Sequence, residues 1–203
     1  MKRYFLALIT ICTLAFTIQG QAGTMLRGLE QGIPNPDAQP NSNAFGKSLD
    51  GWMETYLRWL EDGADPDARV KNIAFLPIIG ESPFIVEVEP RTALMLPIAT
   101  WIATEGEDAL PDEWWGDRDH IFGDVYVDGQ PVAVPNADFY VGPTVLDPSI
   151  VLFGDEYDYY QALVVVIKPL TPGEHQIVLH SEFVDFSAVF DNTWNITVTP
   201  PGK

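Results

Sequence analysis

From residue 72 onward the chain is a succession of short apolar segments separated by Gly and Pro, and this pattern limits the fold more than any other feature. The segments are rich in branched and aromatic side chains, which is typical of β-strands. They read NIAFLPI, PFIVEVE, TALMLPIATWIA, VYVDGQPVAV, DFYV, SIVLF, DYYQALVVVIK, EHQIVLHSEF and FSAVFDNTWNITVTP. So many short strands with turns between them predict a mainly β protein, an antiparallel β-sandwich of the Ig-like or jelly-roll type.

Two turns and one alternation agree with this fold. The Asp-Gly pair in VYVDGQPVAV predicts a tight hairpin turn. Residues 169–173 join the two longest strands, because their prolines end pairing and their glycine tolerates a positive φ. In the last segment Trp194, Ile196 and Val198 alternate with polar residues, so we expect that strand to bury one face.

A different periodicity precedes the strands. In SLDGWMETYLRWLEDG the apolar residues recur every three or four positions, which predicts an amphipathic α-helix over residues 48–62. Ser48 is suited to be its N-cap, and Gly63 is suited to end it. We expect its aromatic face to be buried against the sandwich or to cover an open edge.

The first 22 residues are interpreted as a secretory signal peptide. Lys2 and Arg3 form a basic start, an apolar stretch follows, and small residues precede a cleavage site that we place after Ala22. The stretch is too short to span a bilayer, and no later segment is suited to do so. We expect an exported protein, periplasmic or extracellular, that is soluble after cleavage and not inserted in a membrane. Cys12, the single cysteine, would leave with the signal, which excludes disulfides and thiol chemistry.

The net charge of the 203-residue chain is −18, with 29 acidic and 11 basic residues. A surface this acidic repels nucleic acid, anionic lipid and acidic polysaccharides. Cations, basic partners and neutral ligands are the binding classes that remain. Residues 23–47 are rich in Gly, Pro, Asn and Gln and are interpreted as an extended lead-in or linker. Residues 48–199 form the single predicted domain.

Several short motifs resemble a group of uncharacterised secreted bacterial proteins. They are the helix start GKSLDGWMETYLRWL, the strand RTALMLP, the hairpin VDGQPV, and DYYQALVVVIKPLTPGEHQIVLHSEF with its Pro-Leu-x-Pro-Gly-x-His turn. Together they span most of residues 45–199. The resemblance implies a secreted β-sandwich with an N-terminal Trp-rich helix. Because that group has no established activity, the resemblance implies no catalytic residues.

The spacing of the three histidines does not suit the binding of one metal ion by two or more of them. His175 and His180 are five positions apart on one predicted strand, so their side chains point to opposite faces. His175 follows the turn, where its ring can bind a nearby backbone carbonyl, and His120 stands alone. We expect structural or solvated roles for all three.

The sequence contains neither G-x-S-x-G nor H-E-x-x-H, so we expect no catalytic residues and no cofactor. Paired carboxylates are too numerous here to indicate a glycosidase. Two acidic segments are alternatives as Ca²⁺ sites, because Ca²⁺ prefers oxygen ligands. One segment contributes Asp62, Asp65 and Asp67, and the other is FGDEYDY, although neither matches an EF-hand.

The segment DEWWGDRDH, residues 112–120, places two tryptophans among acids. Pro111 and the acids after it predict a short second helix. On such a helix Trp114 stacks on Arg118 as an exposed contact, whereas Trp115 packs with Phe122 as an anchor. The candidate ligand-binding residues are Trp114, Trp115, Arg118 and Tyr160.

These features predict a non-enzymatic exported β-sandwich that binds a partner protein or a neutral ligand such as a glycan. Fold class alone does not establish function, so two alternatives stay open. One is a hydrolase of neutral glycans that uses two carboxylates from the acidic loops. The other is a structural, envelope-associated domain whose Trp helix docks on another protein, in which case the apolar stripe over residues 49–60 would be exposed.

Overall fold

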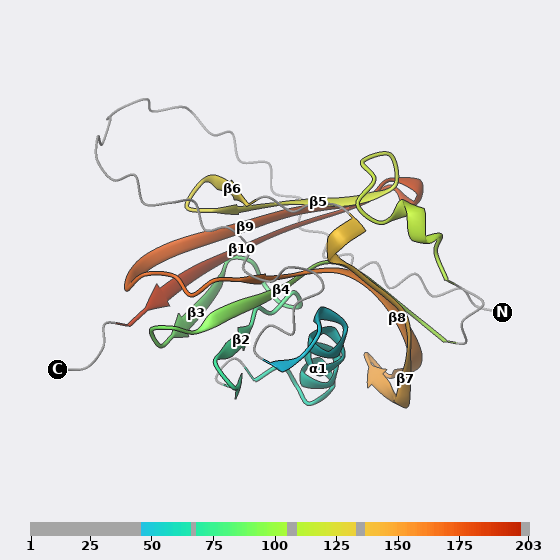
Figure 1. Cartoon of the computed structure of the whole chain (residues 1–203), viewed down its shortest axis with the longest axis horizontal. Helices are drawn as coiled ribbons and strands as arrows, with labels where there is room; N and C mark the ends of the chain where they lie inside the picture. Colours follow the sequence, from blue (N-terminus) through green and yellow to red (C-terminus); the bar gives the residue numbers. More distant parts are fainter. Residues whose placement is uncertain (1–45, 66–67, 105–108, 133–136, 200–203) are drawn as a thin grey trace.

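The computed structural model describes residues 46–65, 68–104, 109–132 and 137–199, and these ranges form two packed β-sheets and one α-helix (Figure 1). The β-sandwich predicted from the strand pattern is confirmed. The predicted signal peptide and the lead-in up to residue 45 lie outside the described residues. Within the described ranges, none of the helices has the length and apolar composition that a bilayer crossing needs.

Sheet A has the strand order β1-β2-β4-β8-β7, and sheet B has the order β3-β10-β9-β5-β6. Sheet A contains β1 (Arg69–Val70), β2 (Ile73–Phe75), β4 (Ala93–Ala103), β7 (Tyr140–Leu152) and β8 (Asp155–Ile167). Sheet B contains β3 (Phe84–Val88), β5 (Ile121–Val127), β6 (Gln130–Val132), β9 (Gly173–Phe183) and β10 (Ala188–Val198). The 3₁₀ turns η3 (Asp112–Trp114), η4 (Ala137–Phe139) and η5 (Val184–Phe186) lie between strands. Strand β2 pairs with β4 in parallel, and β3 pairs with β10 in parallel. The sheets are therefore mixed, whereas the sequence predicted antiparallel sheets.

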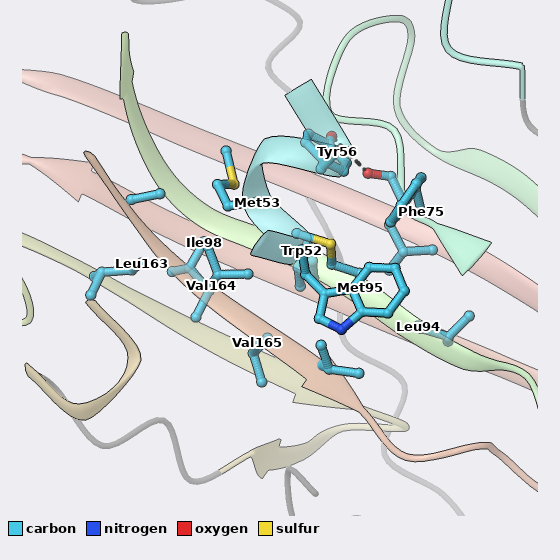
Figure 2. Close-up of a cluster of buried hydrophobic side chains, with 14 of the residues drawn as sticks. Trp52, Met53, Tyr56, Phe75, Leu94, Met95, Ile98, Leu163, Val164 and Val165 are labelled. Atoms are coloured by element: carbon cyan, nitrogen blue, oxygen red, sulfur yellow. Dashed lines mark hydrogen bonds between the residues drawn. The ribbon is translucent and has the colours of Figure 1, made fainter. Parts of the chain in front are cut away.

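Helix α1 (Leu49–Glu61) covers the outer face of sheet A. Figure 2 shows Trp52 and Met53 of the helix beside Met95 of β4 and Val164 of β8, and all four side chains are buried. A strand that is buried on both faces needs apolar residues at consecutive positions. This explains the unbroken apolar runs of β4 and β8. It also means that the apolar stripe over residues 49–60 is buried and is not available to a docking partner.

The ends of α1 follow the sequence signals. The Ser48 hydroxyl accepts a hydrogen bond from the Gly51 amide at 3.1 Å, which is the predicted N-cap. Gly63 adopts a φ of 97° after the last turn. The amide of Gly63 donates to Leu60, and that of Ala64 donates to Trp59, as in a Schellman motif.

Tight turns join two pairs of strands. Asp128 and Gly129 both have positive φ and join β5 to β6, which confirms the predicted hairpin. Phe153 and Gly154 form a similar turn between β7 and β8. The segment FGDEYDY is therefore a hairpin turn followed by a strand, and not the acidic loop that we predicted. The predicted short strands DFYV and SIVLF are joined in one strand, because β7 begins in the first segment at Tyr140 and ends in the second at Leu152, with two register shifts between them.

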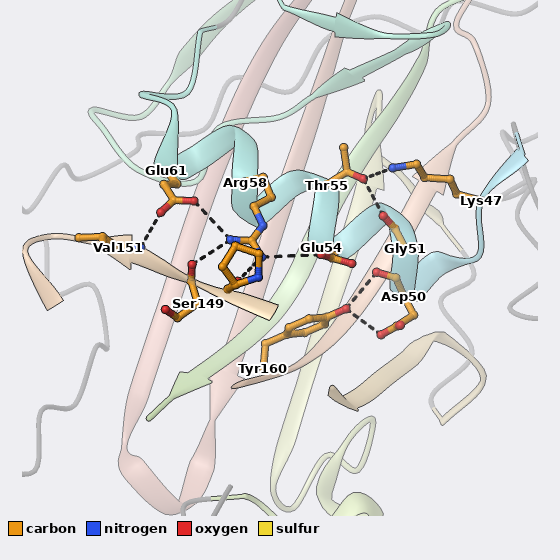
Figure 3. A network of polar contacts seen from close by, with 11 residues as sticks. Lys47, Asp50, Gly51, Glu54, Thr55, Arg58, Glu61, Ser149, Val151 and Tyr160 are labelled. Atoms are coloured by element: carbon orange, nitrogen blue, oxygen red, sulfur yellow. Dashed lines mark hydrogen bonds and ion pairs between the residues drawn. The ribbon is translucent and has the colours of Figure 1, made fainter. Parts of the chain in front are cut away.

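Side chains of α1 cover the backbone of the edge strand β7 (Figure 3). Arg58 donates hydrogen bonds to the carbonyl oxygens of Pro148 and Ser149, and the second of these measures 3.0 Å. The Glu61 carboxylate accepts from the amide of Val151 at 2.8 Å. An uncovered edge strand can pair with a strand of another molecule. The helix occupies this part of the edge of sheet A.

Candidate functional site

The outer faces of the two sheets differ, because the α-helix of the described part of the chain lies on sheet A and not on sheet B. In β9, Ile177, Leu179 and Ser181 are buried between the sheets, so the residues that alternate with them point outward. The strand register extends this assignment to β3, β5 and β10. We define the outer face of sheet B by Ile85, Glu87, Phe122, Asp124, Tyr126, Glu174, Gln176, Val178, His180, Glu182, Val189, Asp191, Thr193, Asn195 and Thr197.

The register arranges these side chains in rows across β5, β9, β10 and β3. The rows are Phe122-Glu182-Val189, Asp124-His180-Asp191, Tyr126-Val178-Thr193, Gln176-Asn195-Ile85 and Glu174-Thr197-Glu87. Neighbours within a row lie about 5 Å apart and interact directly. His180 is therefore flanked by an aspartate on each side, and the two adjacent rows contain the apolar or aromatic residues Phe122, Val189, Tyr126 and Val178.

Apolar side chains are exposed on this face. Ile85 is 70 % exposed, Val189 55 % and Tyr126 37 %. Phe122 and Val178, in the same rows, are half-buried. Single exposed apolar residues are ordinary on any protein, but several on one sheet face are typical of an interaction surface.

Apart from histidine, the charged side chains of this face are acidic. The five strands of sheet B contain acidic residues but no Lys or Arg. The acidic residues are Glu87, Asp124, Glu174, Glu182 and Asp191, and all of them belong to the outer face. His180 and Arg118, which precedes β5, form ion pairs with three of these acids, namely Asp124, Glu182 and Asp191.

His180 lies at the centre of the face and uses both ring nitrogens. Its Nδ1 lies 2.8 Å from a carboxylate oxygen of Asp191, and its Nε2 lies 2.7 Å from one of Glu182. The hydrogen bonds to Asp191 and then to Glu182 raise the pKa of His180, and they outweigh the opposing effect of burial. The two carboxylates therefore favour the protonated ring.

Arg118 extends the face toward the turn before β5. Its guanidinium lies 4.8 Å from the ring centre of Phe122 and 2.5 Å from the Asp124 carboxylate. The Phe122 ring in turn lies 6.3 Å from the ring of His180. The predicted stacking of Arg118 on Trp114 is wrong, since Arg118 stacks on Phe122 instead.

Trp114 stacks on His120 with ring centres 4.7 Å apart and planes inclined by 4°. The predicted second helix is only the single 3₁₀ turn η3, because Trp115 is already extended and Gly116 has a φ of 87°. Nδ1 of His120 lies 2.8 Å from Asp185, and this hydrogen bond raises the pKa of His120. Trp114 is half-buried and keeps part of its surface in solvent.

His175 anchors the β5–β6 turn at the other end of sheet B. Its Nδ1 lies 2.7 Å from Asp128, and its Nε2 lies 2.8 Å from the carbonyl oxygen of Thr171. The predicted contact of this ring with a backbone carbonyl is confirmed, as is its position opposite His180. Burial alone would lower the pKa of His175, but the hydrogen bonds to Asp128 and Thr171 raise it.

Two of the four candidate ligand-binding residues lie inside the protein. Trp115 is buried and stacks on Tyr140 at 5.4 Å, with the edge of Phe183 at 6.2 Å, so its predicted packing on Phe122 is wrong. Tyr160 is fully buried under α1 and donates a hydrogen bond to Asp50. Trp114 and Arg118 are the candidates that reach the surface.

A buried polar network holds the segment that carries Trp114. The Gln161 side chain exchanges two hydrogen bonds of 2.8 Å with the backbone of Leu110 and donates to the Tyr140 hydroxyl at 2.7 Å. That hydroxyl donates to Asp112 at 2.6 Å. Burial, and then the Asp112 carboxylate, raise the pKa of Tyr140. The network fixes η3 against the end of sheet A.

The alternative Ca²⁺ site is only partly described. Asp62 and Asp65 are exposed after the end of α1, and Asp67 lies outside the described residues. The carbonyl oxygen of Asp65 accepts a hydrogen bond from the Trp59 indole at 2.8 Å. Among the residues that the structure describes, no three His, Cys, Asp or Glu side chains are grouped to hold a metal ion.

No model of a known protein family and no curated protein matches the sequence. The described residues form a β-sandwich with one sheet covered by a helix and one sheet whose outer face carries acidic residues. Sequence reasoning did not find the centre of this face, namely His180 with Asp191 and Glu182. The alternation in EHQIVLHSEF marks one side of the strand as polar, but the neighbouring strands depend on long-range pairing.

Proposed function

We propose that this chain is an exported binding module that holds a partner protein through the outer face of sheet B. The observation that carries the proposal is the difference between the two sheets. Helix α1 covers the outer face of sheet A, whose exposed apolar strand residues, Val145 and Val151, lie on its edge strand β7. Sheet B instead presents Ile85, Tyr126 and Val189 to solvent on three strands, among acidic residues. Export rests on the predicted signal peptide, and a binding role without catalysis rests on the lack of a catalytic motif in the sequence.

The chemistry of the face favours a partner surface that carries both basic and apolar groups. Aromatic and apolar side chains form the centre of protein interfaces, and charged residues form the rim. The five acids of sheet B and a net charge of −18 attract basic surfaces and speed their association. A second copy of this chain would meet the same acids, and like charges across an interface oppose docking.

Two single variants test the proposal with matched chemistry. Val189→Lys places a cation on the outer face of sheet B, and Val145→Lys does so on edge strand β7 of sheet A, where Val145 is 74 % exposed. Each purified variant and the wild type are immobilised, exposed to an envelope extract, and compared for the proteins that they retain. We expect a basic protein to be retained by wild type and Val145→Lys and to be reduced at least about tenfold by Val189→Lys.

Equal retention by all three chains would overturn the proposal. A thermal-shift screen with neutral oligosaccharides checks the neutral-ligand alternative on the same samples. A specific ligand at 100 times its Kd adds about 2.7 kcal/mol of stability, which such a screen detects. A thermal shift with an oligosaccharide, together with no retained protein, would indicate that the ligand of this protein is a glycan and not a partner protein.

A further inference from the structure

We propose that His180 is a charge switch at the centre of the outer face of sheet B, which weakens docking of a basic partner when its ring is protonated and strengthens it when the ring is neutral. The inference rests on the proposed function and adds a regulatory group to the same face.

Every strand next to His180 directs an acid toward it. Glu182 comes from its own strand β9, Asp191 from β10, and Asp124 from β5. The guanidinium of Arg118, which precedes β5, pairs with Asp124. A protonated imidazole donates from both nitrogens and so satisfies Asp191 and Glu182 together.

A neutral imidazole carries only one N–H, so it satisfies only one of the two carboxylates. Deprotonation of His180 therefore has two effects at one place. The face gains one unit of negative charge, and one carboxylate becomes free to pair with a cation of the partner. Val189 and Tyr126 lie in the rows on either side, so a partner that covers them reaches this carboxylate.

The other histidines lack this arrangement. His120 pairs with Asp185 outside the strands, and His175 pairs with Asp128 in the turn at the far end of the sheet. Each ring pairs with a single carboxylate, so a neutral ring can still donate to it. Their titration changes the total charge of the protein but frees no acid within the rows of the face.

The probe for the test is a fluorescent eight-residue peptide of alternating lysine and valine, because it combines basic and apolar groups at strand spacing. Its affinity for the full chain is measured by anisotropy at about pH 6 and about pH 8.5, on either side of the histidine transition. We expect wild type to bind about fivefold more tightly at the higher pH, the upper range for one exposed charge pair. The difference should shrink as salt is added.

Three variants assign the effect to one ring. His180→Gln should bind tightly at both pH values, and His180→Lys, with its fixed charge, should bind weakly at both. The control His120→Gln should keep the wild-type dependence on pH. Circular dichroism spectra confirm that each variant is folded before it is compared.

The outcomes separate the switch from the proposed function. Tight binding with the same affinity at both pH values in wild type overturns the switch and leaves the docking face intact. A dependence on pH that persists in His180→Gln also overturns it and points to another group. No binding by any chain at either pH overturns docking of basic partners on this face, and the switch with it.

Discussion

The hydroxyl of Tyr160 lies 2.7 Å from a carboxylate oxygen of Asp50, and this contact joins the first turn of α1 to sheet A across 110 positions of the chain (Figure 3). The same carboxylate accepts a hydrogen bond from Thr144 of β7 at 2.7 Å. Burial, and then the Asp50 carboxylate, raise the pKa of Tyr160, so its hydroxyl stays protonated and donates. One acid thereby fixes the helix to two strands.

Tyr160→Phe removes the donor and leaves Asp50 with one partner fewer. Hydrogen bonds to charged groups contribute more than neutral ones, so we expect unfolding to require about 1–3 kcal/mol less. Urea denaturation measures the difference, and Tyr126→Phe on the exposed face is the matched control. A change no larger than that of the control would show that the Tyr160 hydroxyl does not stabilise the helix contact.

Tyr159→Phe should have the opposite effect, although Tyr159 is the adjacent residue. Its hydroxyl is buried between the sheets and has no hydrogen-bond partner in the described part of the chain. Burial, and then the charge of Asp112, raise the pKa of Tyr159 to about 12. Removing an unsatisfied buried hydroxyl should leave stability unchanged or raise it by up to about 1 kcal/mol. The same urea series would contradict this reading if Tyr159→Phe lost more than about 1 kcal/mol.

Gly123→Ala should destabilise the contact between the two sheets. A Cβ at this position would lie 2.3 Å from Cγ2 of Ile98 on β4 and 3.1 Å from the His180 carbonyl oxygen. Such overpacking costs about 1–3 kcal/mol. Thermal denaturation measures this cost, and it should fall in a chain that also carries Ile98→Ala, which removes the clash. An equal cost in both backgrounds would assign the effect to the backbone instead.

Stability should fall as the pH rises above neutral. Carboxylate partners raise the pKa of His120, His175 and His180 in the folded protein above the unfolded value of about 6.5. The stabilisation is complete below that unfolded value and is lost as the pH rises through the folded pKa values. Urea denaturation between about pH 6 and pH 9 should show a decreasing free energy of unfolding, with a smaller decrease for His180→Gln. A constant or increasing value would contradict the pairing.

Local patterns in the sequence predict most elements of this fold. The helix from Leu49 to Glu61 follows from its apolar spacing, and Trp194, Ile196 and Val198 are buried as their alternation predicts. The length of β7 was missed because Gly142, Pro143 and Pro148 interrupt its apolar pattern. The parallel pairs were missed for a different reason. Pairing between distant strands is decided by packing of the whole chain, and no local spacing records it.

The candidate site depends even more on distant pairings. Trp114 and Arg118 were found because aromatic and cationic residues stand out within one segment, yet their partners His120 and Phe122 follow from a backbone that turns instead of continuing as a helix. His180 lies at the centre of a face because β9 pairs with β5 on one side and with β10 on the other. Its sequence neighbours do not include Asp124 or Asp191.

The distribution of lysines has a practical consequence for any study of this protein. Among the described residues the lysines are Lys47, Lys71 and Lys168, which lie before α1, in the β1–β2 turn and just after β8. Amine-directed coupling through these residues would attach the molecule to a sensor chip without modifying any strand of sheet B. Carbodiimide coupling of carboxylates would instead modify the acids of sheet B and mask the face whose binding is to be measured.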